Sequence, residues 1–166
     1  MKITISGKPG SGTSTISKLL SEKLGYEHLS TGDFMRDLAS DKKLSLLELS
    51  KLAEEDDEVD KLLDARQEKF GKEKEDFVLD ARIGFHFIPD SKKIYLDVSD
   101  EEAIKRIKKR EQDSTEEEYY DRLNSERKRY KKLYNLDFED FNNYDIVIKT
   151  DKLKPDEILN LILKMI

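Results

Sequence analysis

The sequence has 166 residues, 41% charged and 36% hydrophobic, and a net charge of −6, which favours one compact domain and argues against a nucleic-acid-binding surface. It has no long apolar run and no charged-then-apolar leader, so we expect a cytoplasmic protein without a membrane partner, and we favour a monomer. The absence of cysteine excludes disulfides, thiolate metal sites and a cysteine nucleophile.

Patterns typical of strands and helices alternate along the chain. The expected strands cover residues 2–6, 26–30, 77–80, 93–98 and 144–149. Apolar residues at helical spacing lead from the first strand to Gly25, and further helical patterns cover 32–41, 45–54 and 57–70. Capping residues at Ser99 and Thr115 and a first-turn proline at Pro155 introduce three later helices.

The expected strands are short and mostly apolar, as in sheets that are covered on both faces. An alternation of strands and helices is typical of a parallel sheet with helices on both sides. Ser45-x-x-Glu48 predicts a capping box at the second helix of the 32–72 stretch, and Gly71 is expected to end the third. The sequence therefore predicts an α/β fold around a five-stranded parallel sheet.

A glycine-rich loop connects the first strand to the first helix, which is the context a phosphate-binding loop requires. Gly10 and Gly12 allow backbone N–H groups to approach phosphate oxygens, and the helix directs its positive end at the same point. The Ser14 hydroxyl is placed to ligate Mg²⁺. A glycine-rich turn without a ligand is the less favoured alternative. The expected ATP-binding residues are Gly7, Lys8, Pro9, Gly10, Ser11, Gly12, Thr13, Ser14 and Thr15.

One position departs from the phosphate-loop motif, because Thr13 stands where a lysine normally reaches the β- and γ-phosphates. A neutral hydroxyl cannot offset the charge that develops on a transferred phosphoryl group. Arginines elsewhere, or Lys8 in the loop, would have to supply it. We favour the arginines, because the ordinary interpretation of Lys8 is an exposed loop lysine.

The segment from Ser30 to Arg36 resembles the Ser-Thr-Gly-Asp-x-x-Arg segment of nucleoside monophosphate kinases. The resemblance implies that Arg36 holds the 5′-phosphate of the acceptor nucleotide, although Asp33 and Arg36 could simply form an ion pair. The segment around Asp80 and Arg82 resembles the Asp-Gly-Arg segment of cytidylate kinases, with Ala81 in place of glycine. The implied acceptor-binding residues are Ser30, Thr31, Gly32, Asp33, Arg36, Asp80 and Arg82. Asp80 and Ser14 are the expected Mg²⁺ residues, whereas a buried strand-end cap is the alternative for Asp80.

Arginines are concentrated in the stretch between residues 106 and 129. The segment Arg122 to Tyr130 resembles the corresponding stretch of archaeal-type cytidylate kinases, where a short lid closes over the phosphates. A charged helical hairpin held by ion pairs is the alternative. The expected catalytic arginines are Arg106, Arg110, Arg122, Arg127 and Arg129.

The resemblance implies a P-loop kinase of the archaeal cytidylate kinase type, as one domain covering 1–166. It would have a small helical acceptor-binding insertion at about 32–72 and a lid at about 110–116. Such an enzyme would transfer the γ-phosphoryl group of ATP to CMP or dCMP with Mg²⁺. Two alternatives remain open: a kinase for AMP or UMP, and an ATP-binding switch that transfers nothing useful.

Overall fold

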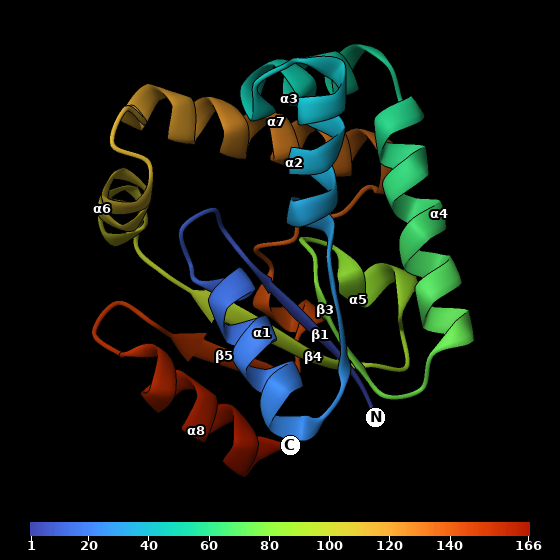
Figure 1. The fold of residues 1–166 in the computed structure, drawn as a ribbon, viewed down its shortest axis with the longest axis vertical. Helices are drawn as coiled ribbons and strands as arrows, with labels where there is room; N and C mark the ends of the chain where they lie inside the picture. Colours follow the sequence, from blue (N-terminus) through green and yellow to red (C-terminus); the bar gives the residue numbers. More distant parts are fainter.

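The computed structural model describes residues 1–166 and confirms the five-stranded parallel sheet with helices on both faces (Figure 1). The strand order is β2-β3-β1-β4-β5, and all neighbouring pairs are parallel. The strands are β1 (Lys2–Gly7), β2 (Glu27–Ser30), β3 (Phe77–Asp80), β4 (Lys92–Asp97) and β5 (Ile146–Lys149). Each lies within about two residues of its expected range.

Helices follow every strand (Figure 1). They are α1 (Thr13–Leu24), α2 (Thr31–Lys42), α3 (Leu46–Glu55), α4 (Glu58–Glu73), α5 (Gly84–Phe87), α6 (Asp100–Arg110), α7 (Glu116–Tyr134) and α8 (Pro155–Met165). The sequence patterns did not indicate α5 or the 3₁₀ turn Phe141–Asn143, because such short segments carry too few residues for a periodic signal. No helix is long and apolar enough to cross a bilayer.

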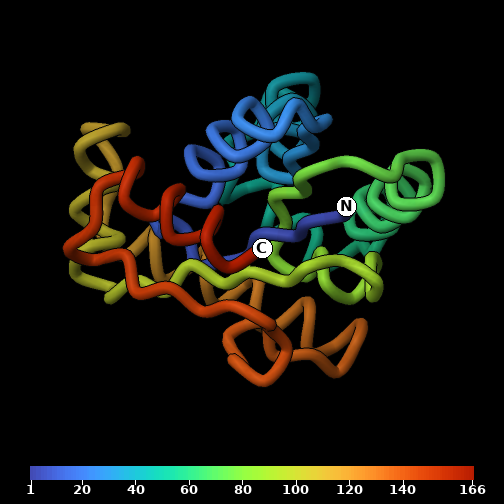
Figure 2. The backbone as a smooth tube through the Cα atoms, turned by 90° about the horizontal axis from the view of Figure 1, so that it is seen from below, coloured from blue at the N-terminus to red at the C-terminus, as the bar shows by residue number.

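One face of the sheet packs against α1 and α8, which lie side by side in both views (Figure 2). Ile3 and Ile5 of β1 contribute to this core together with Ile16 of α1 and Ile162 of α8, and all four side chains are almost completely buried. Burying each such side chain stabilises the fold by roughly 1.5–3 kcal/mol. This layer fixes α1, and therefore the loop before it, against the central strand.

The opposite face is covered by α5, α6 and α7 together with the segment that contains Phe138. Tyr95 of β4 lies in this core, whereas its neighbours Ile94 and Leu96 belong to the other. This alternation follows from the two-residue period of a strand and explains why the three central residues of β4 are all apolar.

The helices α2, α3 and α4 occupy the segment between β2 and β3 and form a small core of their own around Leu49, Ala53 and Val59 (Figure 1). Helix α3 also packs along α7. The turn 111–115 joins α6 to α7. The stretch at 32–72 is therefore a unit of three helices. The stretch at 110–116 is the connection between α6 and α7.

Helix caps account for several of the observed boundaries. The expected capping box is present at Ser45 and Glu48. Gly25 ends α1 with a positive φ of 70°, as expected. The expectation for Gly71 is wrong, since α4 continues to Glu73. A Cβ atom on Gly71 would collide with the side chain of Ile88, so this glycine permits close packing rather than a helix end.

Candidate active site

The phosphate loop lies at the carboxyl end of β1, against α6. Gly10 and Gly12 have φ values of 83° and 94°, which other residues rarely adopt. A Cβ atom on Gly10 would lie 2.6 Å from the carbonyl oxygen of Ala103, so the loop also needs glycine for its close approach to α6. Gly12 precedes α1 directly, which places the free N–H groups of the first helical turn at the loop.

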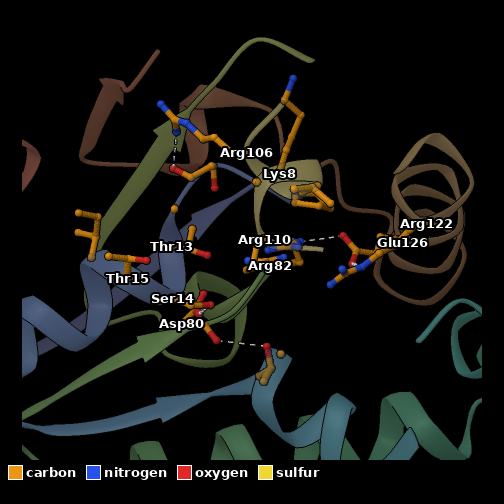
Figure 3. Close-up of a pocket in the computed structure, with 18 of the residues that line it drawn as sticks. Lys8, Thr13, Ser14, Thr15, Asp80, Arg82, Arg106, Arg110, Arg122 and Glu126 are labelled. Carbon is orange, nitrogen blue, oxygen red and sulfur yellow. Dashed lines mark hydrogen bonds and ion pairs between the residues drawn. The ribbon is translucent and has the colours of Figure 1, made fainter. Parts of the chain in front are cut away.

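A cavity of about 580 Å³ extends from this loop in two directions (Figure 3). One part is bounded by the loop after β5, and the other by the α2–α4 unit and α7. The expected site residues that line it are Lys8, Pro9, Gly10, Ser11, Gly12, Thr13, Ser14, Thr15, Thr31, Gly32, Arg36, Asp80, Arg82, Arg106, Arg110, Arg122 and Arg129. Most of the residues singled out in the sequence therefore converge on one cavity.

Asp80 and Ser14 lie next to each other in the wall of the cavity (Figure 3). The register places Asp80 opposite Ile5, one step from the phosphate loop. The Ser14 hydroxyl donates to Asp80 Oδ2 at 2.7 Å, and the Ser30 hydroxyl donates to the same oxygen at 3.3 Å. Hard oxygen donors of this kind suit Mg²⁺, which binds through one or two protein oxygens, water and substrate phosphates. The residues present therefore fit a magnesium–nucleotide complex.

Lys8 is not an exposed loop lysine, contrary to expectation. Its side chain is only 12% exposed, and Nζ donates to Asp100 Oδ1 at 2.6 Å. The hydroxyl of Tyr119 donates to the same oxygen at 2.9 Å. Because of these contacts with Lys8 and Tyr119, the pKa of Asp100 lies below its ordinary value despite the opposing effect of burial. The ammonium group is thus held by a carboxylate of α6.

Arg82 and Arg122 face a shared carboxylate in the cavity wall (Figure 3). Arg82 Nε donates to Glu126 Oε2 at 2.7 Å, and Arg122 Nε lies 3.5 Å from Oε1. Burial would raise the pKa of Glu126, but the two guanidinium groups hold it below its ordinary value. Two arginines with one carboxylate leave a net positive charge that an anionic ligand can balance.

Arg106 lies near the loop that follows β5, on the other side of the cavity. Its Nη2 donates to the carbonyl oxygen of Thr150 at 2.7 Å, and its Nε donates to Glu102 at 3.0 Å. Arg110 also lines the cavity and pairs with the exposed Glu111. Arg106 is therefore anchored by buried backbone and side-chain groups, whereas Arg110 is held only by an exposed ion pair with its neighbour Glu111.

Four of the expected site residues do not line the cavity. Arg127 pairs with Glu139 at 2.6 Å on the outside of α7, because it falls on a different side of the helix from Arg122 and Glu126. Asp33 forms an ion pair with Arg36 at the start of α2, which is the simple alternative considered above. The other two are Gly7, which packs closely against the side chain of Ser11 in the loop, and Ser30, which caps the N-terminus of α2.

Sequence reasoning missed the loop 151–155, which lines the cavity beyond Arg106. The signal was available, because ligands of parallel α/β sheets bind at the carboxyl ends of the strands and this loop follows β5. It also missed Met35, Leu46, Ser50 and Leu63, which line the cavity from the α2–α4 unit. Their helical spacing alone did not distinguish cavity lining from core.

Known proteins resemble this chain in sequence over almost its whole length. Residues 2–152 match the family described as the cytidylate kinase-like family. The chain belongs to that family. A cytidylate kinase of Natronomonas pharaonis is 43% identical over 163 residues, covering 95% of this chain and 85% of the relative. One from Methanosphaera stadtmanae is 36% identical over 169 residues and covers 100% and 98% of the two chains.

The fold of this cytidylate kinase-like chain is that of P-loop kinases. The crystal structure of shikimate kinase from Aquifex aeolicus superposes with a TM-score of 0.61 and 20% identity, covering 99% of this chain and 95% of the other. At that identity the likeness concerns the fold alone. The chain is a nucleoside monophosphate kinase with the nucleotide-binding loop of its fold class.

Proposed function

We propose that the protein transfers the γ-phosphoryl group of ATP to CMP or dCMP, giving ADP and CDP or dCDP. The main support for this proposal is a single cavity that is lined by the phosphate loop, by Arg36 and Arg82, and by the hydrogen-bonded pair of Ser14 and Asp80. The relatives named cytidylate kinase support the choice of acceptor. Both ends of the cavity belong to one chain, so a monomer suffices, and we expect a cytoplasmic enzyme.

In this proposal the phosphate loop binds ATP, and the loop 151–155 borders its nucleoside. Arg36 and Arg82 hold the acceptor phosphate at the opposite end. Ser14 and Asp80 hold Mg²⁺, which would neutralise charge on the ATP phosphates. The acceptor oxygen is already ionised, so the reaction needs no general base. The chain's task is to align the two phosphates and exclude water.

Charge neutralisation falls to the arginines, because Thr13 cannot supply it. Arg122 and Arg110 approach from α7 and α6, on either side of the turn 111–115. Movement of this turn would bring both guanidinium groups toward the transferred group. Closure would also exclude water, which otherwise accepts the phosphoryl group.

The test is an acceptor panel with the full chain. The protein is incubated with Mg-ATP and CMP, dCMP, UMP or AMP in turn, and diphosphate formation is followed. We expect the highest kcat/KM with CMP or dCMP. Clear transfer to AMP or UMP with none to CMP would overturn the choice of acceptor. Bound ATP without transfer to any acceptor would favour the switch alternative.

Replacing Arg36 by alanine separates acceptor binding from ATP binding. We expect Arg36→Ala to raise the KM for CMP by a factor of about 10–100, because it removes a charge-assisted contact to the acceptor phosphate. The Kd for ATP should change less than about threefold. Equal losses for both nucleotides would contradict the role proposed for Arg36.

A further inference from the structure

The phosphate loop contacts the first turns of α6, and one of these contacts extends to α7. Lys8 Nζ donates to Asp100 Oδ1 at 2.6 Å, and the hydroxyl of Tyr119 donates to the same oxygen at 2.9 Å. Arg106 also reaches the loop, at the carbonyl oxygen of Ser11, but none of its hydrogen bonds involves α7. Asp100 is therefore a bridge between the phosphate loop and α7.

Burial makes this bridge selective for one arrangement of the loop and α7. The side chain of Lys8 is largely buried, and a buried ammonium group without a carboxylate partner is strongly unfavourable. Tyr119 is only 4% exposed, and its ring lies in the same apolar core as Ile107 and Leu123. Hydrogen bonds to an ionised acceptor such as Asp100 are stronger than those between neutral groups. The carboxylate therefore holds both of its partners in defined positions.

A second cavity separates the phosphate loop from the stretch of α7 that carries Arg122. It has a volume of about 370 Å³, and Pro9, Tyr119 and Arg122 are among the residues that line it. Arg122 follows Tyr119 by three positions, so the two side chains are neighbours on the surface of the helix. The position of Arg122 relative to the loop thus depends on how Tyr119 is held, by its ring in the core and by its hydroxyl at Asp100.

We propose that Asp100 is a positioning residue for phosphoryl transfer, which aligns the phosphate loop with Arg122 through its contacts with Lys8 and Tyr119. This inference rests on the proposed function, in which the loop binds ATP and Arg122 neutralises charge on the transferred group. Asp100 does not line the main cavity, so it acts through the residues that it holds. A small displacement of a charged group slows transfer more than it weakens nucleotide binding, because alignment matters most in the transition state.

The first test is Tyr119→Phe in the full chain, which removes the hydroxyl and keeps the ring. We expect kcat with saturating Mg-ATP and CMP to fall about threefold to tenfold, while the KM for each nucleotide changes less than about twofold. The inorganic phosphate formed per ADP should rise, since a misaligned acceptor competes less well with water. Tyr120→Phe is the matched control, because Tyr120 packs its ring against Tyr119 and does not bond to Asp100. It should leave kcat unchanged.

A double-mutant cycle tests the bridge itself. Lys8→Ala and Tyr119→Phe each break the connection through Asp100, so the second change should lower kcat by less than about twofold beyond the first. Two losses that multiply in the double variant would show that Lys8 and Tyr119 act independently, and they would overturn the inference.

Asp100 variants cover the case in which Tyr119→Phe does not fold. Asparagine keeps an acceptor oxygen, so Asp100→Asn should retain a kcat at least about fivefold higher than that of Asp100→Ala. A wild-type kcat in the folded variants, with a change in thermal stability alone, would show that Asp100 is structural and would overturn the inference. A wild-type chain that transfers nothing to CMP would instead refute the proposed function.

Discussion

At the residue scale, ion pairs hold several arginines of the cavity wall in place. Arg82 and Arg122 share the carboxylate of Glu126, whereas Arg129 pairs with the buried Asp60. The sequence indicated the arginines through their density and suggested the ion pair of Arg36 with Asp33, but not the pair of Arg129 with Asp60. Asp60 is almost 70 positions from Arg129, and no local pattern predicts such a pairing.

Lys8 provides a test of how the enzyme manages without a lysine at position 13. Because Lys8 is held by Asp100, we expect Lys8→Ala to lower kcat for ATP-dependent transfer by less than about tenfold, well below the loss usual for a group that stabilises the transition state. Steady-state kinetics with saturating CMP measures this effect. A loss of several hundredfold would show that Lys8 leaves Asp100 and acts on the phosphates.

Asp64 gives a pH-dependent prediction. It accepts a hydrogen bond from Tyr134 between α4 and α7, and burial raises the pKa of Asp64 to about 6. A carboxyl with a raised pKa favours folding while it is protonated, and this stabilisation is lost as the pH rises from about 4 through 6. Asp64→Asn cannot ionise, so its stability should improve relative to wild type over that interval.

Urea unfolding at pH 4.5 and pH 7.5 measures this difference. Asp57→Asn is a control at the residue that precedes the same helix, because Asp57 pairs with Lys132 at the surface. The free energy of unfolding of Asp64→Asn minus that of wild type should be more positive at pH 7.5. A difference independent of pH would contradict the raised pKa.

At the scale of elements, alternation and capping residues predicted the order and most boundaries of strands and helices. The phosphate loop was also predictable, because its glycines, strand and helix are contiguous in the sequence. The packing of α3 on α7 was not, since it depends on contacts between distant segments. The close packing of Gly71 against Ile88 was not predictable either, because helix periodicity does not reveal contacts with distant residues.

Gly10 tests the contact between the phosphate loop and α6. A Cβ atom on residue 10 would collide with the backbone of Ala103, and an alanine there would have to keep an unfavourable positive φ. We therefore expect Gly10→Ala to destabilise the protein by about 1–3 kcal/mol and to weaken ATP binding. Gly25→Ala is the control, because Gly25 has a positive φ of 70° but open space around it. It should reduce stability alone, by about 1 kcal/mol. Unchanged ATP affinity in Gly10→Ala would contradict the close fit.

At the scale of the whole molecule, an acidic protein encloses a cavity rich in arginine. The whole chain has a net charge of −6, yet Arg36, Arg82, Arg110 and Arg122 all line the cavity. The sheet explains this convergence, because all strands are parallel and direct their carboxyl ends to one edge. Segments from residue 8 to residue 158 therefore contribute to a single cavity.

The most direct test of phosphoryl transfer is the stoichiometry of products from Mg-ATP and CMP. ADP, CDP and inorganic phosphate are quantified over the same time course with the full-length chain. We expect one CDP for each ADP and little free phosphate, because closure of the cavity would align the acceptor and exclude water. ADP that appears with an equal amount of inorganic phosphate, and without CDP, would contradict it.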